Sequence, residues 1–251
     1  MDRLRAVLLD AGGTLIHPDQ EWILGRLAGE GVDATSADYE RARREADAAV
    51  GDILRSDDPG TDETRIRTWF TTLLLALGLP EDRLAAVAED IRERHARAAL
   101  WVRPVPGTRA MLESLRAAGL RLAVISNADG RVADYLATAG LADLFELILD
   151  SALEGVEKPD PEIFERALDR MEVRAGEAVY VGDTWPVDVE GARRAGIEPI
   201  YLADDARAIP ERVDDVVRIG SILELPRALG LEDGSAAPAT GASRAGAGED
   251  D

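Results

Sequence analysis

The sequence predicts an α/β protein: a Rossmann-like, doubly wound parallel sheet with an inserted, all-helical cap. Short apolar runs of β type recur along the chain and alternate with amphipathic, helix-like segments, several of which end in glycine. One long region interrupts this alternation and contains helix-like segments alone. Alternating strands and helices are typical of a parallel sheet covered by helices on both faces. The interruption is therefore interpreted as an insertion.

The apolar runs give the order of elements in the core. Strands are predicted at residues 5–10, 121–126, 145–150, 178–183 and 198–203. The segments between the later strands have an apolar stripe at helical spacing and predict helices at residues 106–119, 130–140, 160–171 and 187–196.

Residues 17–101 are predicted to form the cap, placed above the strand ends where it could act as a lid. We expect helical segments and no convincing strand in this region, with helices near residues 19–29, 36–54, 63–78 and 81–100. Residues 1–16 and 102–230 then form the core. We expect residues 231–251 to be disordered, because they are small, polar and without periodicity.

Composition limits the classes of function. The 251 residues include no cysteine, which excludes disulfides, a thiolate nucleophile and cysteine-bound metals. The net charge of −20 argues against nucleic acid as a partner, because such binding depends on Lys and Arg. No apolar stretch is long enough to span a membrane, and no signal peptide is recognised. We therefore expect a soluble cytoplasmic protein, monomeric or homodimeric, that acts on a small molecule.

Polar side chains follow the apolar runs, where ligands bind in an open parallel sheet. These residues are Asp10, Ser126, Asn127, Lys158, Asp183 and Thr184. Taken one at a time, Ser126, Asn127 and Asp183 are as well explained as helix N-caps. Asp10 differs, because the two glycines after it let the backbone approach a ligand or adopt positive φ, which a cap does not require.

Lys158 is the only lysine in the chain, whereas the other 28 of its 29 basic residues are arginine. A single lysine indicates a position that needs a compact ammonium, which a planar guanidinium cannot replace. The alternative is that one lysine escaped a compositional drift towards arginine.

Asp183 and Asp188 form a paired-acid loop in the segment "VGDTWPVD". Asp183 closes a strand and Asp188 lies in the first turn of the next helix, so both carboxylates can face one pocket. Such a pair suits Mg²⁺, which binds one or two carboxylates and keeps water or substrate phosphate as its other ligands. For Asp188 alone, a favourable interaction with the helix dipole is an equal explanation.

Four segments in order, "LLDAGGTL", "VISN", "EKPDPEIF" and "VGDTWPVD", resemble the sequence motifs of the haloacid dehalogenase superfamily. The resemblance covers about residues 5–203 and places the insertion where the C1-type cap of that superfamily belongs. It implies that Asp10 is a nucleophile that forms an aspartyl-phosphate. Ser126 and Asn127 would bind the transferring phosphoryl group, and Lys158 would neutralise and orient it.

The same resemblance implies a magnesium site. Asp10, the backbone carbonyl of Gly12 and Asp183 would bind the ion, and Asp188 would support or join these ligands. The charges fit, because an anionic nucleophile that attacks a phosphate needs a metal and an ammonium to screen the repulsion.

Gly12 departs from the motif of the superfamily's phosphatases, which carry a second Asp there. That Asp protonates the leaving oxygen and later activates water, so its loss removes acid–base help worth about 10²–10⁴ in rate. Good leaving groups would suffer least. His17, Asp19 or Asp129 could supply the proton from nearby loops, and His17 has the most suitable pKa.

We therefore predict a Mg²⁺-dependent phosphatase of a small phosphorylated metabolite, with two alternatives left open. A dehalogenase of the same superfamily would attack carbon through Asp10 without metal, but it would carry a tyrosine at position 12. A binding module would have kept the fold and lost turnover, although Asp10, Lys158 and Asp183 are all present. Phosphonate cleavage is excluded, because it needs a cap lysine and residues 17–101 contain none.

Tryptophans and arginines near the cap could contact the substrate. Trp22, Trp69 and Trp101 are predicted to be core residues rather than pocket lining, and Trp185 is predicted to form a pocket wall. Three arginines could bind a substrate carboxylate or second phosphate, although a solvated face is the preferred explanation of the first two: Arg43, Arg44 and Arg103.

Overall fold

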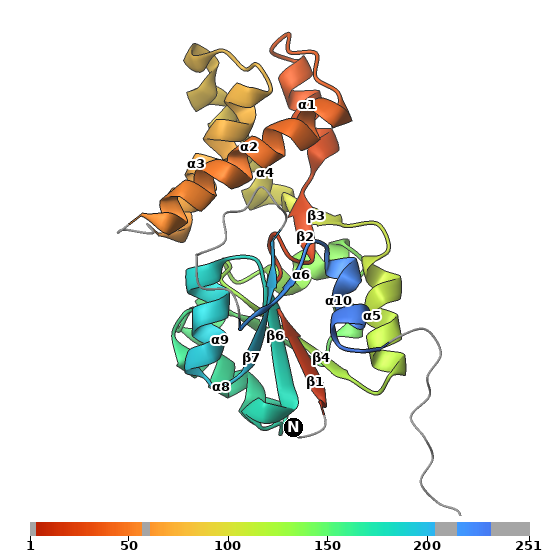
Figure 1. The fold of residues 1–251 in the computed structure, drawn as a ribbon. Helices are drawn as coiled ribbons and strands as arrows, with labels where there is room; N and C mark the ends of the chain where they lie inside the picture. The colour runs from red at the N-terminus through yellow and green to blue at the C-terminus, as the bar shows by residue number, and fades with distance from the viewer. Residues whose placement is uncertain (1–3, 57–60, 204–214, 232–251) are drawn as a thin grey trace, which may run out of the picture.

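The computed structural model describes residues 4–56, 61–203 and 215–231. These residues form a parallel sheet with helices on both faces and a separate group of helices beyond one end of the strands (Figure 1). The predicted α/β class is confirmed. The tail that we expected to be disordered lies outside the described residues from position 232 onward.

The main sheet has six strands in the order β5-β4-β1-β6-β7-β8, and every pairing is parallel. Its strands are β1 (Ala6–Leu9), β4 (Arg121–Ser126), β5 (Leu147–Asp150), β6 (Ala178–Gly182), β7 (Glu198–Leu202) and β8 (Val217–Ile219). The first five match the predicted strands, and β8 was not predicted. The chain runs outward on both sides of β1, so a ligand site is expected where β1 ends.

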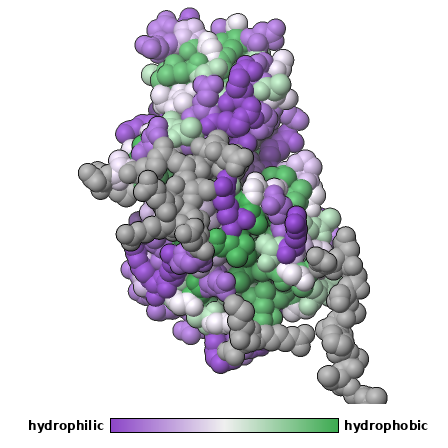
Figure 2. All heavy atoms as spheres, in the orientation of Figure 1, coloured by the Kyte–Doolittle hydropathy of each residue, from purple (hydrophilic) through white to green (hydrophobic). Residues whose placement is uncertain are grey.

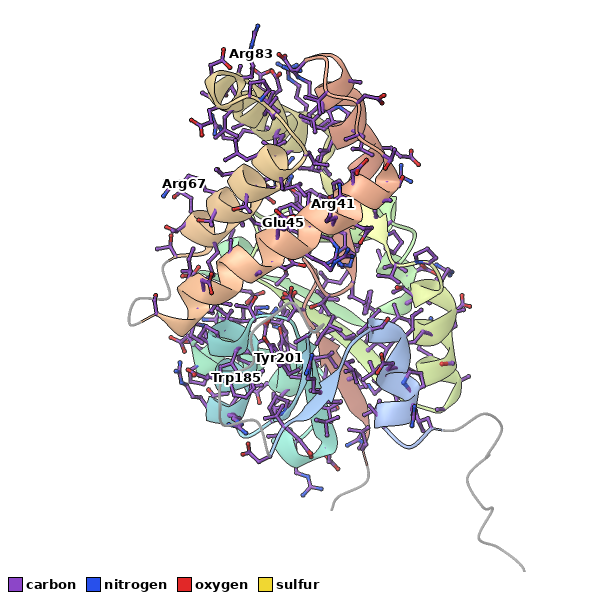
Figure 3. The ribbon with its side chains drawn as sticks, turned by 45° about the horizontal axis from the view of Figure 1, so that its top comes forward. Arg41, Glu45, Arg67, Arg83, Trp185 and Tyr201 are labelled. Atoms are coloured by element: carbon purple, nitrogen blue, oxygen red, sulfur yellow. The ribbon has the colours of Figure 1, made fainter. Side chains whose placement is uncertain are left out.

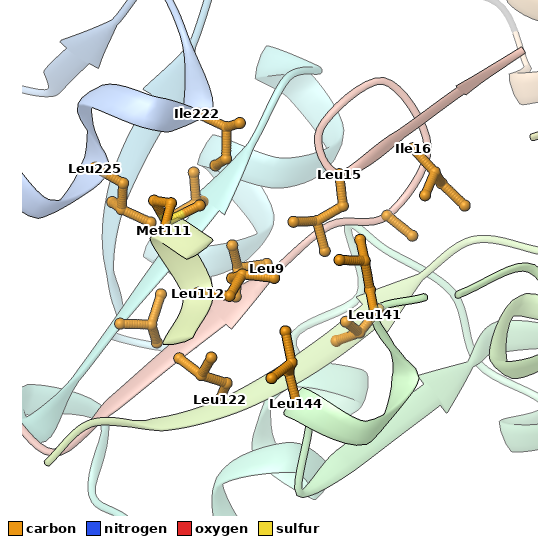
Figure 4. Packing of buried hydrophobic residues seen from close by; sticks show 14 of the residues in the cluster. Leu9, Leu15, Ile16, Met111, Leu112, Leu122, Leu141, Leu144, Ile222 and Leu225 are labelled. Atoms are coloured by element: carbon orange, nitrogen blue, oxygen red, sulfur yellow. The ribbon is translucent and has the colours of Figure 1, made fainter. Parts of the chain in front are cut away.

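Both faces of β1 are buried, in different clusters. Val7 and Leu9 pack with residues of α5 (Thr108–Ala117) and α6 (Val132–Thr138), and Figure 4 shows Leu9 among Met111 and Leu112 of this cluster. Ala6 and Leu8 pack on the opposite face with α8 (Pro161–Arg170). Since side chains alternate along a strand, a continuous apolar run is needed where both faces are covered.

Shorter elements complete the core. They are η2 (Ala142–Leu144), α7 (Ser151–Glu154), η3 (Ala175–Glu177), the π-helix η4 (Trp185–Val189), α9 (Glu190–Arg194), η5 (Ile222–Glu224) and α10 (Leu225–Ala228).

The helical region lies between the first two strands of the main sheet in the chain. It contains α1 (Gln20–Ala28), α2 (Ser36–Arg55), α3 (Asp62–Ala76), η1 (Glu81–Arg83) and α4 (Leu84–Ala98). Its helices share an apolar core of their own, which includes Leu27, Leu73 and Leu74. Thr35 begins α2 with a capping box to Asp38, which fixes where that helix starts.

The two ends of the helical region differ from the prediction. β2 (Ile16–Pro18) and β3 (Trp101–Pro104) pair antiparallel, so His17, Pro18 and Trp101 lie in strands rather than in a strand-free segment. Strands of three and four residues are too short for their alternation to be recognised. This ribbon connects the helical region with the core. It also brings Trp101 next to the loop that follows β1, near Gly12.

The surface reflects the charged composition. On the face in Figure 2, hydrophilic side chains cover much of the helical region, and a larger apolar area lies over the core. None of the helices in the described residues has the length and apolar content needed to cross a membrane.

Candidate active site

A cavity of about 560 Å³ lies between the carboxyl ends of the central strands and the helical region. The core contributes Asp10, Ser126, Lys158 and Asp183, and these residues come from segments far apart in the chain. The helical region contributes residues of α2, α3 and α4 to the same lining. The predicted polar residues at the strand ends thus meet in one place, as the parallel topology requires.

Lys158 lies at the centre of the buried polar groups. Its Nζ donates to Asp10 Oδ1 at 2.7 Å, to Asp188 Oδ1 at 2.8 Å and to the Tyr180 hydroxyl at 2.9 Å. An ammonium has three protons, so these bonds use all of them. The Tyr180 hydroxyl also lies 3.0 Å from Asp188 Oδ1. A lysine that is 3% exposed is stable here because its charge is paired on two sides.

Burial and charge shift the pKa values of this group. Burial raises the pKa of Asp10 from 3.8 to about 7; Lys158 opposes the shift, and the carboxylates of Asp188 and Asp183 add to it. Burial alone would lower the pKa of Lys158, but Asp10 and Asp188 raise it well above its ordinary value. The lysine is therefore charged, and the cluster holds more negative than positive charge once Asp10 ionises.

Three carboxylates form a group that could hold a cation. One oxygen each from Asp10, Asp183 and Asp188 lies within 4.8 Å of the others. The Lys158 ammonium bonds to Asp10 and Asp188 of this group, and a divalent cation would balance more of the negative charge of the three carboxylates. Asp188 is the most constrained of the three, because it also accepts from the Thr184 backbone N–H at 2.9 Å. The donor set of carboxylate oxygens fits a hard ion such as Mg²⁺.

The two glycines after Asp10 have different roles. Gly13 has φ +83°, and a Cβ there would overlap Asp183 Oδ2 and lie 3.0 Å from Asp183 Cγ. Glycine is therefore required at position 13. Gly12 has no positive φ, and among the described residues a Cβ there would meet the Trp101 ring alone, at an ordinary 3.7 Å. Backbone geometry thus explains Gly13, whereas it leaves Gly12 unexplained.

Ser126 is the last residue of β4, Asn127 follows it, and both line the cavity. The Asn127 side chain bonds to Lys158 twice: its Nδ2 donates to the Lys158 carbonyl at 2.9 Å, and its Oδ1 accepts from the Lys158 N–H at 2.8 Å. These bonds fix the backbone of the lysine. For the Asn127 side chain, positioning of Lys158 is a better account than direct contact with substrate.

The three predicted substitutes for the acid are placed differently. His17 lines the cavity from β2. Asp19 caps α1 and forms an ion pair with Arg103 at 3.2 Å, and it is absent from the residues that line this cavity. Asp129 lines the cavity, but Arg131 binds it at 2.5 Å.

A cluster that the sequence did not reveal joins the helical region to the core. His95 of α4 lies 3.4 Å from both Asp129 Oδ2 and the Tyr135 hydroxyl, and Tyr135 donates to Asp129 at 2.7 Å. His95 Nδ1 accepts from the Leu100 N–H at 3.3 Å. Burial lowers the pKa of His95, and Asp129 only partly opposes this. The imidazole is therefore neutral near pH 7 and holds two parts of the chain together.

The tryptophan predictions are partly wrong. All three predicted core residues, Trp22, Trp69 and Trp101, pack on the core of the helical region, but Trp69 and Trp101 also line the cavity. Trp185 is not a cavity wall: its ring packs edge-on against Tyr201, with centroids 5.3 Å apart, in a small apolar cluster. Figure 3 shows these two rings together in the core. The sequence around a single tryptophan does not show whether its side chain lies in a core or along a cavity.

The arginine predictions also need one correction. Arg43 is half-buried, lines the cavity and pairs with Asp47 at 2.6 Å, so it does not lie on a solvated face. Arg44 is exposed, as predicted. Arg103 is exposed and pairs with Asp19 and Glu21 outside the main cavity. In the helical region, Arg67 and Arg83 point away from the core (Figure 3).

Tyr180 and Asp47 are site residues that sequence reasoning missed. Tyr180 is a polar aromatic residue inside the apolar run of β6, which was the available signal. Asp47 is 4% exposed on a helix that is otherwise highly charged, so nothing in the sequence distinguishes it from its neighbours.

Comparison with known proteins identifies the family. The family model for haloacid dehalogenase-like hydrolases matches residues 4–196. The chain therefore belongs to the haloacid dehalogenase-like hydrolases and is an enzyme of the hydrolase class. The resemblance of the four motifs is thereby confirmed.

Two relatives match most of the chain. Haloacid dehalogenase-like hydrolase domain-containing protein 3 of Mus musculus is 29% identical over 223 residues, which are 86% of each chain. Glyceraldehyde 3-phosphate phosphatase of Methanopyrus kandleri is 37% identical over 206 residues, which are 79% of this chain and 84% of the relative.

Two solved structures resemble the protein to similar degrees. A HAD phosphatase from Thermococcus onnurineus has a TM-score of 0.56 at 25% identity and covers 90% of this chain and 98% of its own. A 2-haloacid dehalogenase from Pseudomonas syringae has a TM-score of 0.54 at 26% identity, with the same coverage. Overall similarity of fold therefore does not separate the two chemistries.

Proposed function

We propose that this protein is a Mg²⁺-dependent phosphatase of a small phosphorylated metabolite. The observation that carries the proposal is the buried group in which Lys158 pairs with Asp10 and Asp188 while Asp183 lies within 4.8 Å. A carboxylate nucleophile beside a cation site and a fixed ammonium suits attack on a phosphate, whose charge both cations would neutralise. A relative named as a glyceraldehyde 3-phosphate phosphatase supports a phosphorylated substrate.

Asp10 acts as the nucleophile in this proposal. One of its oxygens bonds to phosphorus, and the bond between phosphorus and the leaving oxygen breaks, which gives an aspartyl-phosphate. Water then attacks phosphorus, releases inorganic phosphate and restores the carboxylate. Because burial raises the pKa of Asp10 to about 7, a positive charge near the site is needed to keep it ionised at neutral pH.

Lys158, Ser126 and Asn127 serve the phosphoryl group. The Lys158 ammonium, held at 2.7 Å from Asp10, neutralises and orients the group beside the nucleophile. Ser126 lines the cavity and is the candidate for a direct bond to a phosphoryl oxygen. Asn127 holds the backbone of Lys158 in place through its two amide bonds.

The residues that would hold Mg²⁺ are Asp10, the Gly12 carbonyl and Asp183, with Asp188 supporting or joining them. When bound, the ion would supply charge stabilisation to the phosphoryl oxygens. Gly13 keeps this arrangement possible, because any side chain there would displace Asp183.

Hydrolysis of 4-nitrophenyl phosphate and acetyl phosphate, with and without Mg²⁺, tests the proposal. We expect turnover that requires Mg²⁺ and is lost in Asp10→Asn. Acid quenching during turnover of acetyl phosphate labelled in its phosphoryl group should leave label on the wild-type protein and none on Asp10→Asn. Failure to hydrolyse either compound would refute the proposed function.

A dehalogenase remains the second candidate, because the structural match to a 2-haloacid dehalogenase is nearly as good as that to a phosphatase. The group of three carboxylates argues against it, since attack on carbon needs no metal. Release of halide from a 2-haloacid without metal would favour the dehalogenase. Inactivity towards both substrate classes would favour a binding module.

The expected setting of the protein follows from its composition. The net charge of −20 supports a small-molecule substrate rather than nucleic acid, and the lack of cysteine supports a reducing cytoplasm. We keep a monomer or homodimer as the expected state.

A further inference from the structure

An aromatic wall lies next to the nucleophile loop. It consists of Trp69 of α3 and Trp101 of β3, whose ring centroids are 6.3 Å apart at an angle of 40°. Both residues line the cavity that contains Asp10, and the Trp101 ring approaches the position of a Cβ on Gly12 to 3.7 Å. A group attached to a phosphate at Asp10 would therefore meet aromatic surface.

A buried carboxylate fixes the orientation of this wall. Asp47 accepts from the Trp69 indole N–H at 2.8 Å and from Arg43 at 2.6 Å. The polar edge of the indole is thus satisfied inside the helical region. The same part of the lining has four further apolar side chains, Val50, Leu54, Ile66 and Phe70, and two charged ones, Glu63 and Arg65. Such a surface suits a flat, apolar group better than a sugar or a short polyol.

Four residues of the cavity lining that could donate a proton are engaged with other groups: Lys158, His95, Tyr135 and Asp129. Among the described residues, Lys158 uses its three protons on Asp10, Asp188 and Tyr180. His95 and Tyr135 bond with Asp129. Burial favours protonation of Asp129, but Arg131 and Tyr135 outweigh it and lower the pKa, so this carboxyl is ionised.

Gly12 offers no proton either, although a side chain has space there. A leaving oxygen that receives no proton from these groups departs as an anion, which only an acidic alcohol tolerates. His17, Glu63 and Glu157 also line the cavity, and the ratio between two aryl phosphates measures whether any of them protonates the leaving oxygen.

We propose that the substrate is the phosphate monoester of a phenol-type alcohol, with its ring on Trp69 and Trp101. The inference rests on the proposed phosphatase function. Asp10 forms a bond to phosphorus, and the aryl oxygen leaves with the electron pair of the broken bond as an aryloxide. It takes a proton from water after release, and a second water hydrolyses the aspartyl-phosphate.

Four phosphates test the two parts of the proposal separately: binding of a ring by the aromatic wall, and departure of the leaving group without a proton donor. 4-Nitrophenyl phosphate has a ring and an acidic leaving group, and phenyl phosphate has a ring and a leaving group whose pKa is about 10, like that of tyrosine. Acetyl phosphate has an acidic leaving group without a ring, and glycerol 3-phosphate has neither. The quantity to compare is kcat/KM, because it is insensitive to hydrolysis of the aspartyl-phosphate.

Without a proton donor, we expect kcat/KM to fall by about 10² or more from 4-nitrophenyl to phenyl phosphate. We expect a further fall to glycerol 3-phosphate and a higher KM for acetyl phosphate than for 4-nitrophenyl phosphate. A ratio within about tenfold between the two aryl phosphates would show that a donor exists and overturn the inference. Equal KM values for acetyl and 4-nitrophenyl phosphate would overturn the role of the aromatic wall. No turnover of any phosphate would instead refute the proposed function.

Variants of the tryptophans test whether Trp69 is responsible for the binding of aryl phosphates. Trp69→Leu should raise KM for aryl phosphates by roughly tenfold and leave KM for acetyl phosphate unchanged. Trp69→Phe keeps a ring but loses the bond to Asp47, so an intermediate effect is expected. Trp22→Leu is the matched control, because Trp22 packs in the helical region outside the cavity lining. An equal rise in KM from Trp22→Leu would attribute the effect to disturbed packing and overturn the assignment.

Gly12→Asp supplies the missing acid at a position with room for it. It should reduce the ratio between 4-nitrophenyl and phenyl phosphate by at least about tenfold. An unchanged ratio, in a variant that still gains thermal stability from Mg²⁺, would overturn the inference.

Discussion

Gly13 and Asp183 are in such close contact that a single added Cβ on Gly13 would overlap the carboxylate of Asp183. The two residues belong to loops that follow neighbouring strands, β1 and β6. The contact packs the nucleophile loop against an acid of the candidate metal site. The contact also distinguishes Gly13 from its neighbour Gly12, where a Cβ would make an ordinary contact with Trp101.

Gly13→Ala should lower the free energy of unfolding by about 1–3 kcal/mol, because φ +83° strains a residue with a Cβ and the new methyl group displaces Asp183. Denaturant unfolding and Mg²⁺ titration measure the two effects. Gly12→Ala is the matched control and should change stability by less than about 1 kcal/mol, since its Cβ would make an ordinary contact with Trp101. Equal losses in both variants would contradict this account.

Mg²⁺ should stabilise the protein against heat. At a concentration of about 100 times Kd, the ion would add about 2.7 kcal/mol to the free energy of unfolding. Asp183→Asn should lose most of this gain, because it removes one of the three clustered carboxylates. Asp169→Asn, an exposed acid on α8, should keep it. The same gain in Asp183→Asn would exclude this residue as a ligand.

Tyr180→Phe should cost about 1–3 kcal/mol of stability, because Lys158 and Asp188 both lose a buried hydrogen-bond partner. Lys158→Met should lower kcat/KM for phosphates by at least about 10²-fold. Urea unfolding and steady-state kinetics give the two quantities. Tyr39→Phe, at a buried tyrosine of α2 outside the main cavity, is the control and should keep kcat/KM. Full activity in Lys158→Met would remove the ammonium from the proposed mechanism.

His95 should make stability depend on pH. Burial lowers the pKa of His95 below 6.5 in the folded protein, and Arg131 adds to this while Asp129 opposes it. The unfolded chain therefore binds more protons as the pH falls, so stability present above pH 6.5 is lost as the pH falls through the folded pKa. His95→Gln should weaken this loss in unfolding experiments between pH 8 and about 5. The only other histidine, His17, provides the matched variant His17→Gln. If His17→Gln weakens the pH dependence more than His95→Gln, the assignment is wrong.

Local patterns in the sequence determined much of the fold and the list of charged site residues. The apolar runs located five of the six strands of the main sheet, because strands buried on both faces need such runs. The residues that close those runs, among them Asp10 and Asp183, meet in one cavity because parallel strands end at the same edge. The lone lysine identified Lys158 before any contact was known.

Only the tertiary structure decided which residues touch. Tyr180 bonds to Lys158, His95 to Asp129, and Trp69 lies beside Trp101, although 22, 34 and 32 positions separate the members of these pairs. Such contacts depend on how whole helices pack, which the pattern within one segment does not contain. The same holds for Gly12 and Gly13: the sequence identified a flexible loop, and the neighbouring Asp183 carboxylate decided that only Gly13 must remain glycine.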